Sequence, residues 1–125
     1  MNKRKVNIFG TTGSIGQSTL NVLRESKEVY DFIAFTAFDN VDQLIADCLE
    51  FRPKYANIGN KKHFLKLKNS LFDTDIIVSH GKQALLDLAS IDVDWSMSAI
   101  IGFAGVEVSL ACAEHSNVLA LANKE

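Results

Sequence analysis

MNKRKVNIFGTTGSIGQSTLNVL forms residues 1–23, and its central stretch GTTGSIG places glycines at positions 10, 13 and 16. A short apolar run, VNIF (6–9), precedes this stretch, and a segment with helical spacing of its apolar residues follows it. A glycine-rich turn between a strand and a helix is a place where the backbone can approach another molecule closely. The spacing therefore raises the question of what this turn approaches.

The three glycines match three separate steric needs of a loop that binds a pyrophosphate group. Gly10 allows a tight exit from the strand, Gly13 leaves no side chain between the backbone and the pyrophosphate, and Gly16 lets the helix pack on the sheet. The amide groups and the dipole at the start of the helix favour an anion. The loop reads GxxGxxG, with Thr12 where the commoner motif has its second glycine. The sequence predicts dinucleotide binding here, with the Thr12 and Ser14 hydroxyls as phosphate donors or Ser14 as the helix cap.

Apolar runs with strand character recur along the chain, and their starts are separated by about 20 to 26 residues, which is room for one strand and one helix. They are VNIF (6–9), FIAFTAF (32–38), YANIG (55–59), DIIVS (75–79), SAIIG (98–102) and VLALA (118–122). Between them, helical spacing predicts helices over 14–25, 41–51, 83–89 and 106–113, the last with Val106, Leu110 and Ala113 on its apolar face. The strands are nearly continuous apolar runs, as in a sheet buried on both faces. We therefore expect an α/β, Rossmann-like, doubly wound and mostly parallel sheet of about six strands with helices on both faces.

Composition indicates one ordered domain over residues 1–125. The chain has 47% hydrophobic and 22% charged residues, one proline and a formal net charge of -2. This charge argues against nucleic-acid binding. The one basic cluster, NKKHFLKLKN (60–69), is interpreted as a solvated helix face that buries Phe64, Leu65 and Leu67, in preference to a phosphate or RNA patch.

The cysteines and the apolar runs bear on the compartment. Cys48 and Cys112 lie in separate apolar stretches without metal-ligand spacing, so we expect reduced core residues. The apolar runs are shorter than the roughly 18 residues of a membrane span, and MNKRK leads directly into a strand. The expectation is a cytoplasmic protein. His63, His80 and His115 share no ligand spacing and are expected on the surface or in loops.

The end of the second strand, FTAFDNVDQL (35–44), is where a nucleotide-binding domain usually contacts the adenosine ribose. Asp39 follows Gly16 at about the spacing of an acid that accepts from the ribose 2′-hydroxyl and repels a 2′-phosphate, which on that rule favours NAD. The alternative is equally supported: Asn40 and Gln43 form a helix cap with its reciprocal partner, and Asp39 is a turn residue.

Four stretches, in this order, resemble the amino-terminal part of the 1-deoxy-D-xylulose 5-phosphate reductoisomerases. They are GTTGSIGQSTLNVL (10–23), CLEFRPKYANI (48–58), AIIGFAGV (99–106) and LALANKE (119–125), and the resemblance runs the length of the chain. It implies an NADPH-dependent enzyme of non-mevalonate isoprenoid synthesis that requires a divalent metal (Mg or Mn). Such an enzyme isomerises and reduces 1-deoxy-D-xylulose 5-phosphate to 2-C-methyl-D-erythritol 4-phosphate, and is a homodimer.

The resemblance also implies roles for particular residues. The cofactor contacts fall on Thr12, Gly13, Ser14 and Ile15, on Phe38, Asp39 and Asn40, and on Asn123 and Glu125; the substrate contact falls on Lys124. The metal ligands and the remaining catalytic groups of the family lie beyond Glu125, so we expect no catalytic residue in this segment. Phe38 and Asp39 stand where the family typically has a glycine and a lysine, so the usual basic partner of the 2′-phosphate is missing there.

Two other functions are compatible with the loop. One is a semialdehyde-dehydrogenase-type NAD(P) reductase domain, which needs a catalytic cysteine or histidine further along the chain. The other is a stand-alone nucleotide-sensing module. The residues that follow Glu125 would separate these alternatives, because an acidic metal-ligand cluster favours the reductoisomerase.

Overall fold

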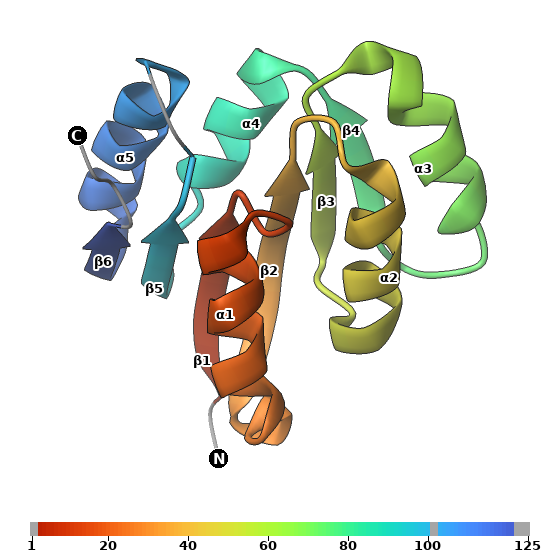
Figure 1. The fold of residues 1–125 in the computed structure, drawn as a ribbon. Coiled ribbons are helices and arrows are strands. Elements are labelled where there is room, and N and C mark those ends of the chain that lie inside the picture. The colour runs from red at the N-terminus through yellow and green to blue at the C-terminus, as the bar shows by residue number, and fades with distance from the viewer. Residues whose placement is uncertain (1–2, 101–102, 122–125) are drawn as a thin grey trace.

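Six parallel strands form one sheet in the order β4-β3-β2-β1-β5-β6 (Figure 1). The computed structural model describes residues 3–100 and 103–121. The strands are β1 (Arg4–Phe9), β2 (Tyr30–Ala37), β3 (Tyr55–Ile58), β4 (Ile77–His80), β5 (Val93–Ser98) and β6 (Ser116–Leu121). The sheet confirms the expected fold class, and every pairing in it is parallel.

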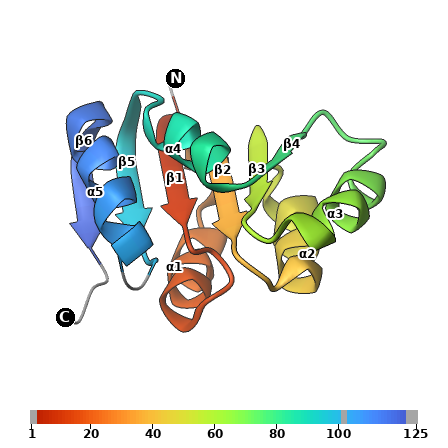
Figure 2. The same cartoon turned by 90° about the horizontal axis from the view of Figure 1, so that it is seen from above.

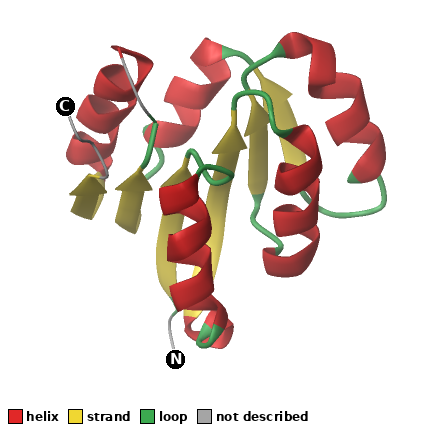
Figure 3. Cartoon of the chain, in the orientation of Figure 1, coloured by secondary structure: helices red, strands yellow, loops and turns green. Residues whose placement is uncertain are grey.

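Helices connect the strands and cover both faces of the sheet (Figures 2 and 3). They are α1 (Ser14–Arg24), α2 (Val41–Phe51), α3 (Phe64–Ser70), α4 (Lys82–Ala89) and α5 (Phe103–His115), with short 3-10 turns η1 (Lys27–Val29) and η2 (Lys61–His63). The helices α1, α2 and α3 pack on one face, and α4 and α5 pack on the other. The chain changes face between β4 and β5, because it moves outward from β1 to β4 and then returns to the other side of β1.

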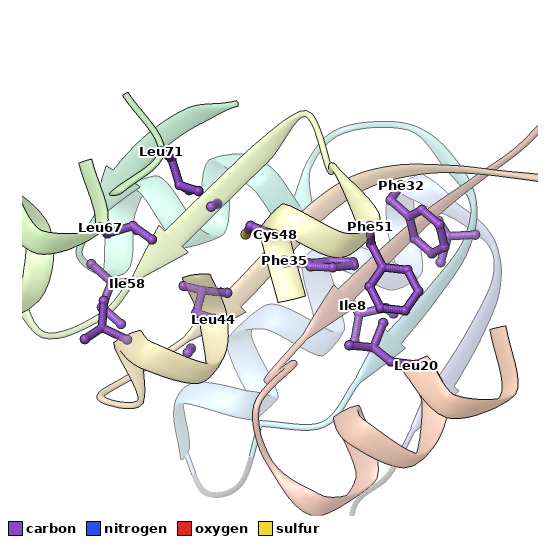
Figure 4. Close-up of a cluster of buried hydrophobic side chains, with 14 of the residues drawn as sticks. Ile8, Leu20, Phe32, Phe35, Leu44, Cys48, Phe51, Ile58, Leu67 and Leu71 are labelled. Atoms are coloured by element: carbon purple, nitrogen blue, oxygen red, sulfur yellow. The ribbon is translucent and has the colours of Figure 1, made fainter. Parts of the chain in front are cut away.

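The larger hydrophobic core lies under α1, α2 and α3 (Figure 4). Its centre is aromatic. The ring centroid of Phe32 lies 5.7 Å from that of Phe35 and 5.2 Å from that of Phe51, and both ring pairs are in edge-to-face contact. Two residues three apart in a strand normally face opposite sides of the sheet. The register between β1 and β2 shifts at Val6/Asn7, so that Ile33 is an extra residue and Phe32 and Phe35 reach the same core.

The smaller core lies under α4 and α5. It contains Phe9, Ala34, Leu88, Ala89, Val108 and Cys112. Cys48 belongs to the larger core, so each layer holds one free, buried cysteine. Burial raises the pKa of the Cys48 thiol to about 12 and that of the Cys112 thiol to about 11. The prediction that both cysteines are core residues is confirmed.

The fifth strand was wrongly placed at 98–102. It is β5 (Val93–Ser98), with the sequence VDWSMS. Two serines of this strand are buried, and each pairs its hydroxyl with another serine. Ser96 Oγ lies 2.7 Å from Ser116 Oγ, and Ser98 Oγ lies 2.9 Å from Ser109 Oγ. Polar residues that satisfy one another in this way can be buried, so the apolar pattern did not reveal the strand.

Two predicted helix faces also differ from the structure. In α5 the expected apolar residues Val106 and Leu110 are exposed, and Val108 and Cys112 are buried instead. The basic cluster does form a helical segment, as expected, and it buries Leu67, but Leu65 is 68% exposed. In both helices apolar residues are abundant on more than one side, so spacing alone does not identify the buried face. None of the helices that the structure describes is long and apolar enough to cross a membrane.

Candidate functional site

The candidate site is the edge of the sheet where β1 and β5 end. Both strands are parallel neighbours, but the chain after β1 enters α1 on one face and the chain after β5 leads to α5 on the other. Such a switch point opens a crevice at the carboxyl ends of the strands, where α/β proteins bind their ligands. The loops after β1 and β2 both lie at this edge.

Gly10 makes the turn at the end of β1. Its φ of 82° is in the left-handed region that favours glycine. A Cβ there would lie only 2.8 Å from the Ala99 carbonyl oxygen, so the loop after β5 passes directly behind Gly10. The Ala99 amide in turn donates to the Phe9 carbonyl at 2.8 Å. The expected tight exit is confirmed, and it results from a close approach of two loops.

Gly13 and Gly16 have different surroundings. A Cβ at Gly16 would overlap the carbonyl oxygens of Gly10 and Thr11, so this glycine lets α1 pack against the loop, not against the sheet as expected. Gly13 is exposed, and a Cβ there would meet the Gly10 carbonyl oxygen at an ordinary 3.7 Å. The fold therefore tolerates a side chain at position 13, and the space beside Gly13 remains open on the side of the solvent.

The start of α1 is not capped by Ser14. The N-cap residue is Gly13, without a side-chain cap, and Ser14 and Ile15 lie in the exposed first turn. The first amide groups of a helix have no acceptor within it. Since no side chain caps this end, the Ser14 hydroxyl and the first amides of α1 are available to an anion at this edge of the sheet.

A threonine pair joins the first loop to the end of β2. The Thr11 amide donates to the Thr36 carbonyl at 2.7 Å, the Thr36 amide donates to Thr11 Oγ1 at 3.0 Å, and the Gly10 amide donates to Thr36 Oγ1 at 2.9 Å. Both threonines are buried. These bonds hold the glycine loop at a fixed position relative to the loop after β2.

The loop after β2 contains Phe38, Asp39 and Asn40, all exposed. Asn40 caps α2, since its Oδ1 accepts from the Gln43 amide at 3.3 Å. The predicted cap is thus present, but Gln43 is not its reciprocal partner, because the Gln43 side chain donates to Asp47 Oδ1 at 2.9 Å. The Phe38 ring lies over Gly59, where a Cβ would collide with it.

Asp39 is held by the loop after β3. Its Oδ1 accepts from Asn60 Nδ2 at 2.8 Å and lies 3.8 Å from His63 Nε2. Lys61 and Lys62 are exposed on the same turn, η2. Arg52 lies at the C-terminal end of α2, at the opposite edge of the sheet, and so is remote from Asp39.

The remaining predicted site residues follow β6. Asn123, Lys124 and Glu125 lie outside the described residues, although β6 ends at the same edge of the sheet as β1 and β5. Within residues 3–100 and 103–121, no group of three or more histidine, cysteine, aspartate or glutamate side chains could hold a metal ion. The described residues therefore do not form a divalent metal site.

Sequence reasoning missed the polar residues beneath the loops. Hydrogen bonds join Thr11 to Thr36, which is 25 positions away, and Gln17 to Asp47, which is 30 positions away. Gln17 also bonds to Thr11, so all four residues are connected. Asp47 lies on the predicted buried side of its helix beside Leu44 and Cys48, where a carboxylate without an expected partner could have been noticed. The partners themselves become visible only in the fold.

Comparison with known proteins gives a consistent result. The family model described as 1-deoxy-D-xylulose 5-phosphate reductoisomerase matches residues 6–125. The chain belongs to this family. The reductoisomerase of Ruegeria sp. (strain TM1040) is 39% identical over 98% of the chain, and that of Rhizobium johnstonii is 41% identical over 98%.

Solved reductoisomerase structures have the same fold. The enzyme from Zymomonas mobilis in complex with NADPH superposes on this chain with a TM-score of 0.94 at 36% identity. The match covers 98% of this chain and 32% of the Zymomonas chain. A complex with NADPH, fosmidomycin and magnesium gives 0.88 at 35% identity over 96% of this chain and 30% of that one. The chain spans about 31% of the length of the curated reductoisomerases that it matches. This membership removes the semialdehyde-dehydrogenase-type alternative.

Proposed function

We propose that residues 1–125 form the NADPH-binding domain of a 1-deoxy-D-xylulose 5-phosphate reductoisomerase. The observation that carries the proposal is the open face of Gly13 at an uncapped helix start, in a fold shared with a reductoisomerase that binds NADPH. Thr12, Gly13, Ser14 and Ile15 would contact the pyrophosphate through amides and hydroxyls. NADPH, when bound, supplies the hydride for the reduction.

The adenosine end of the cofactor would lie over the loop after β2, against Phe38, Asp39 and Asn40. Asp39 is a poor neighbour for a 2′-phosphate, because like charges in contact near a protein surface repel by a few kcal/mol before screening. The bond from Asn60 holds this carboxylate toward the loop after β3. Lys61 and Lys62, on that same loop, are the cations that we propose for the 2′-phosphate.

The nicotinamide end would extend toward the carboxyl end of β6, and Asn123 and Glu125 are proposed as its contacts, with Lys124 at the substrate. Because the described residues do not fit a divalent metal, we assign the Mg or Mn that the family requires to the parts of the relatives that this chain does not cover. The complete enzyme would isomerise and reduce the phosphorylated sugar 1-deoxy-D-xylulose 5-phosphate.

Two further parts of the proposal concern the complete enzyme in the cell. We propose that the full-length protein is a homodimer, as the resemblance to the family implies, and sedimentation of the full-length protein tests this. A cytoplasmic location is supported by two cysteines that are free and buried in separate cores, as suits a reducing compartment. Cell fractionation tests it.

Isothermal titration of the chain with NADPH and, separately, with NADH tests the proposed function. We expect saturable binding of NADPH, with a smaller preference over NADH than a lysine at position 39 would give. A folded chain that binds neither dinucleotide would overturn the proposal. Gly13→Val is the suitable negative control for NADPH binding, because the fold tolerates a side chain at position 13. Gly10→Ala is not suitable, because it strains the fold.

A further inference from the structure

Asp47 is a buried carboxylate in α2 that touches neither proposed cofactor loop directly. Only 2% of its surface is exposed. Its two oxygens have different partners: Oδ2 accepts from Gln17 Nε2 at 2.8 Å, and Oδ1 accepts from Gln43 Nε2 at 2.9 Å. Gln17 belongs to α1 and Gln43 to α2, so a single carboxylate joins the first turns of the two helices.

Each glutamine leads to one of the two loops. Gln17 Nε2 also donates to the Thr11 carbonyl oxygen at 3.1 Å, inside the glycine loop. The Gln43 amide is the group that the Asn40 side chain caps, at the start of α2. A series of hydrogen bonds therefore runs from Thr11 through Gln17 and Asp47 to the Gln43 side chain, and the backbone amide of the same Gln43 continues it to Asn40.

Stability of the fold alone does not explain a buried carboxylate at the centre of this series. Burial raises the pKa of the Asp47 carboxyl, against the two hydrogen bonds from Gln43 and Gln17 that lower it. A raised pKa means that the ionised form is less favoured in the folded chain than in the unfolded one. An apolar side chain at this core-facing position would avoid that cost, so the carboxylate needs another explanation.

We propose that Asp47 is a positioning residue for the dinucleotide, which fixes the glycine loop and the start of α2 at the separation that one bound cofactor must span. This inference rests on the proposed NADPH binding. Without the carboxylate, the Gln17 side chain loses the bond that directs its amide at the Thr11 carbonyl. The loop would then lose part of its order, and binding would have to restore it.

The test is NADPH affinity in the chain, measured by titration well below the unfolding temperature, with thermal unfolding recorded for every variant. Asp47→Ala and Gln17→Ala should each weaken NADPH binding by about five- to tenfold, the effect of losing one hydrogen bond or slightly more. Because both changes break the same bridge, the double variant should bind about as weakly as the weaker single variant. Asp47→Asn keeps an oxygen for Gln17 and should recover most of the affinity.

Two controls separate positioning from stability. Asp87→Ala removes a carboxylate that accepts from a glutamine four residues earlier, Gln83 at 3.0 Å, but on α4 at the other face of the sheet. Val108→Ala lowers stability from the smaller core, which the bridge does not touch. Both controls should bind NADPH as the unchanged chain does, even where the unfolding temperature falls.

The outcomes distinguish the inference from the proposed function. If the unchanged chain does not bind NADPH, the proposed function fails first. If it binds, and Asp47→Ala lowers the unfolding temperature while leaving the NADPH affinity unchanged, Asp47 is a structural tie and the inference is wrong. Additive losses in the double variant would also contradict it, because they would show that Gln17 and Asp47 act separately.

Discussion

At the scale of single residues, Gly13 is the position where ligand and fold can be separated. Gly13→Val should weaken NADPH binding by at least about a few-fold, because the new side chain would occupy the space proposed for the pyrophosphate. The unfolding temperature should change little, since a Cβ at Gly13 meets its neighbour at 3.7 Å. Calorimetric titration and thermal unfolding measure the two effects.

Gly10→Ala is the matched comparison. It should lower the unfolding temperature clearly, because φ is 82° and the Cβ would press on the Ala99 carbonyl. Unchanged NADPH affinity in a folded Gly13→Val variant would remove the loop from the proposed site.

Asp39 offers a test of cofactor preference. Asp39→Lys in the full-length enzyme should raise the affinity for NADPH, leave that for NADH nearly unchanged, and lose part of the gain as salt is raised. Asp39→Asn is the control, because it removes the charge but keeps an oxygen for Asn60. An equal effect on both cofactors would mean that Asp39 is only a turn residue.

Asp47 also predicts a pH dependence of stability. Burial in the folded chain raises the pKa of Asp47 above its ordinary value of 3.8. Its contribution to stability is therefore complete at low pH and decreases as the pH rises through the pKa of the folded state. Asp47→Asn carries no such ionisation. Relative to this variant, the unchanged chain should therefore lose stability as the pH rises from about 4 to neutrality. Denaturant unfolding at several pH values measures the difference; a difference that is constant with pH would contradict it.

At the scale of elements, the start of α2 depends on one cap. Asn40→Ala should cost about 1 kcal/mol of stability, because it leaves the Gln43 amide without its acceptor. Asn40→Ser, which retains a side-chain acceptor, should recover most of the loss. Urea unfolding followed by circular dichroism measures both variants, and equal stability of Asn40→Ala and the unchanged chain would show that the 3.3 Å contact contributes nothing.

The elements also show what the sequence could predict. The first two strands are predicted within a few residues because they are nearly continuous apolar runs, and the helices α1 and α2 because their apolar residues have helical spacing. The strand β5 was not, since its serines become compatible with burial only when Ser116 and Ser109 lie beside them. The same limit applies to the site: the glycine loop is local in sequence, whereas the bridge through Asp47 depends on two helices meeting.

At the scale of the whole molecule, the described residues support cofactor binding but not the complete reaction. A chain of residues 1–125 should convert no 1-deoxy-D-xylulose 5-phosphate with NADPH and Mg or Mn, because the described part holds no group of side chains fit to bind the metal that polarises the substrate. Loss of NADPH absorbance in the presence of substrate is the measurement. Turnover by the purified chain, with the full-length enzyme as a positive control, would contradict this.

The rate at which each buried cysteine is alkylated measures how often its layer of the molecule opens. A thiol with a pKa of about 12 or 11, packed beneath a helix, reacts with an alkylating reagent only after the structure around it has opened. Cys48 reports on the layer under α2, and Cys112 on the layer under α5. Equal labelling rates at the two sites mean that the domain opens as one unit. A faster rate at Cys112 means that the layer under α4 and α5 opens first, while the layer under α1, α2 and α3 stays closed.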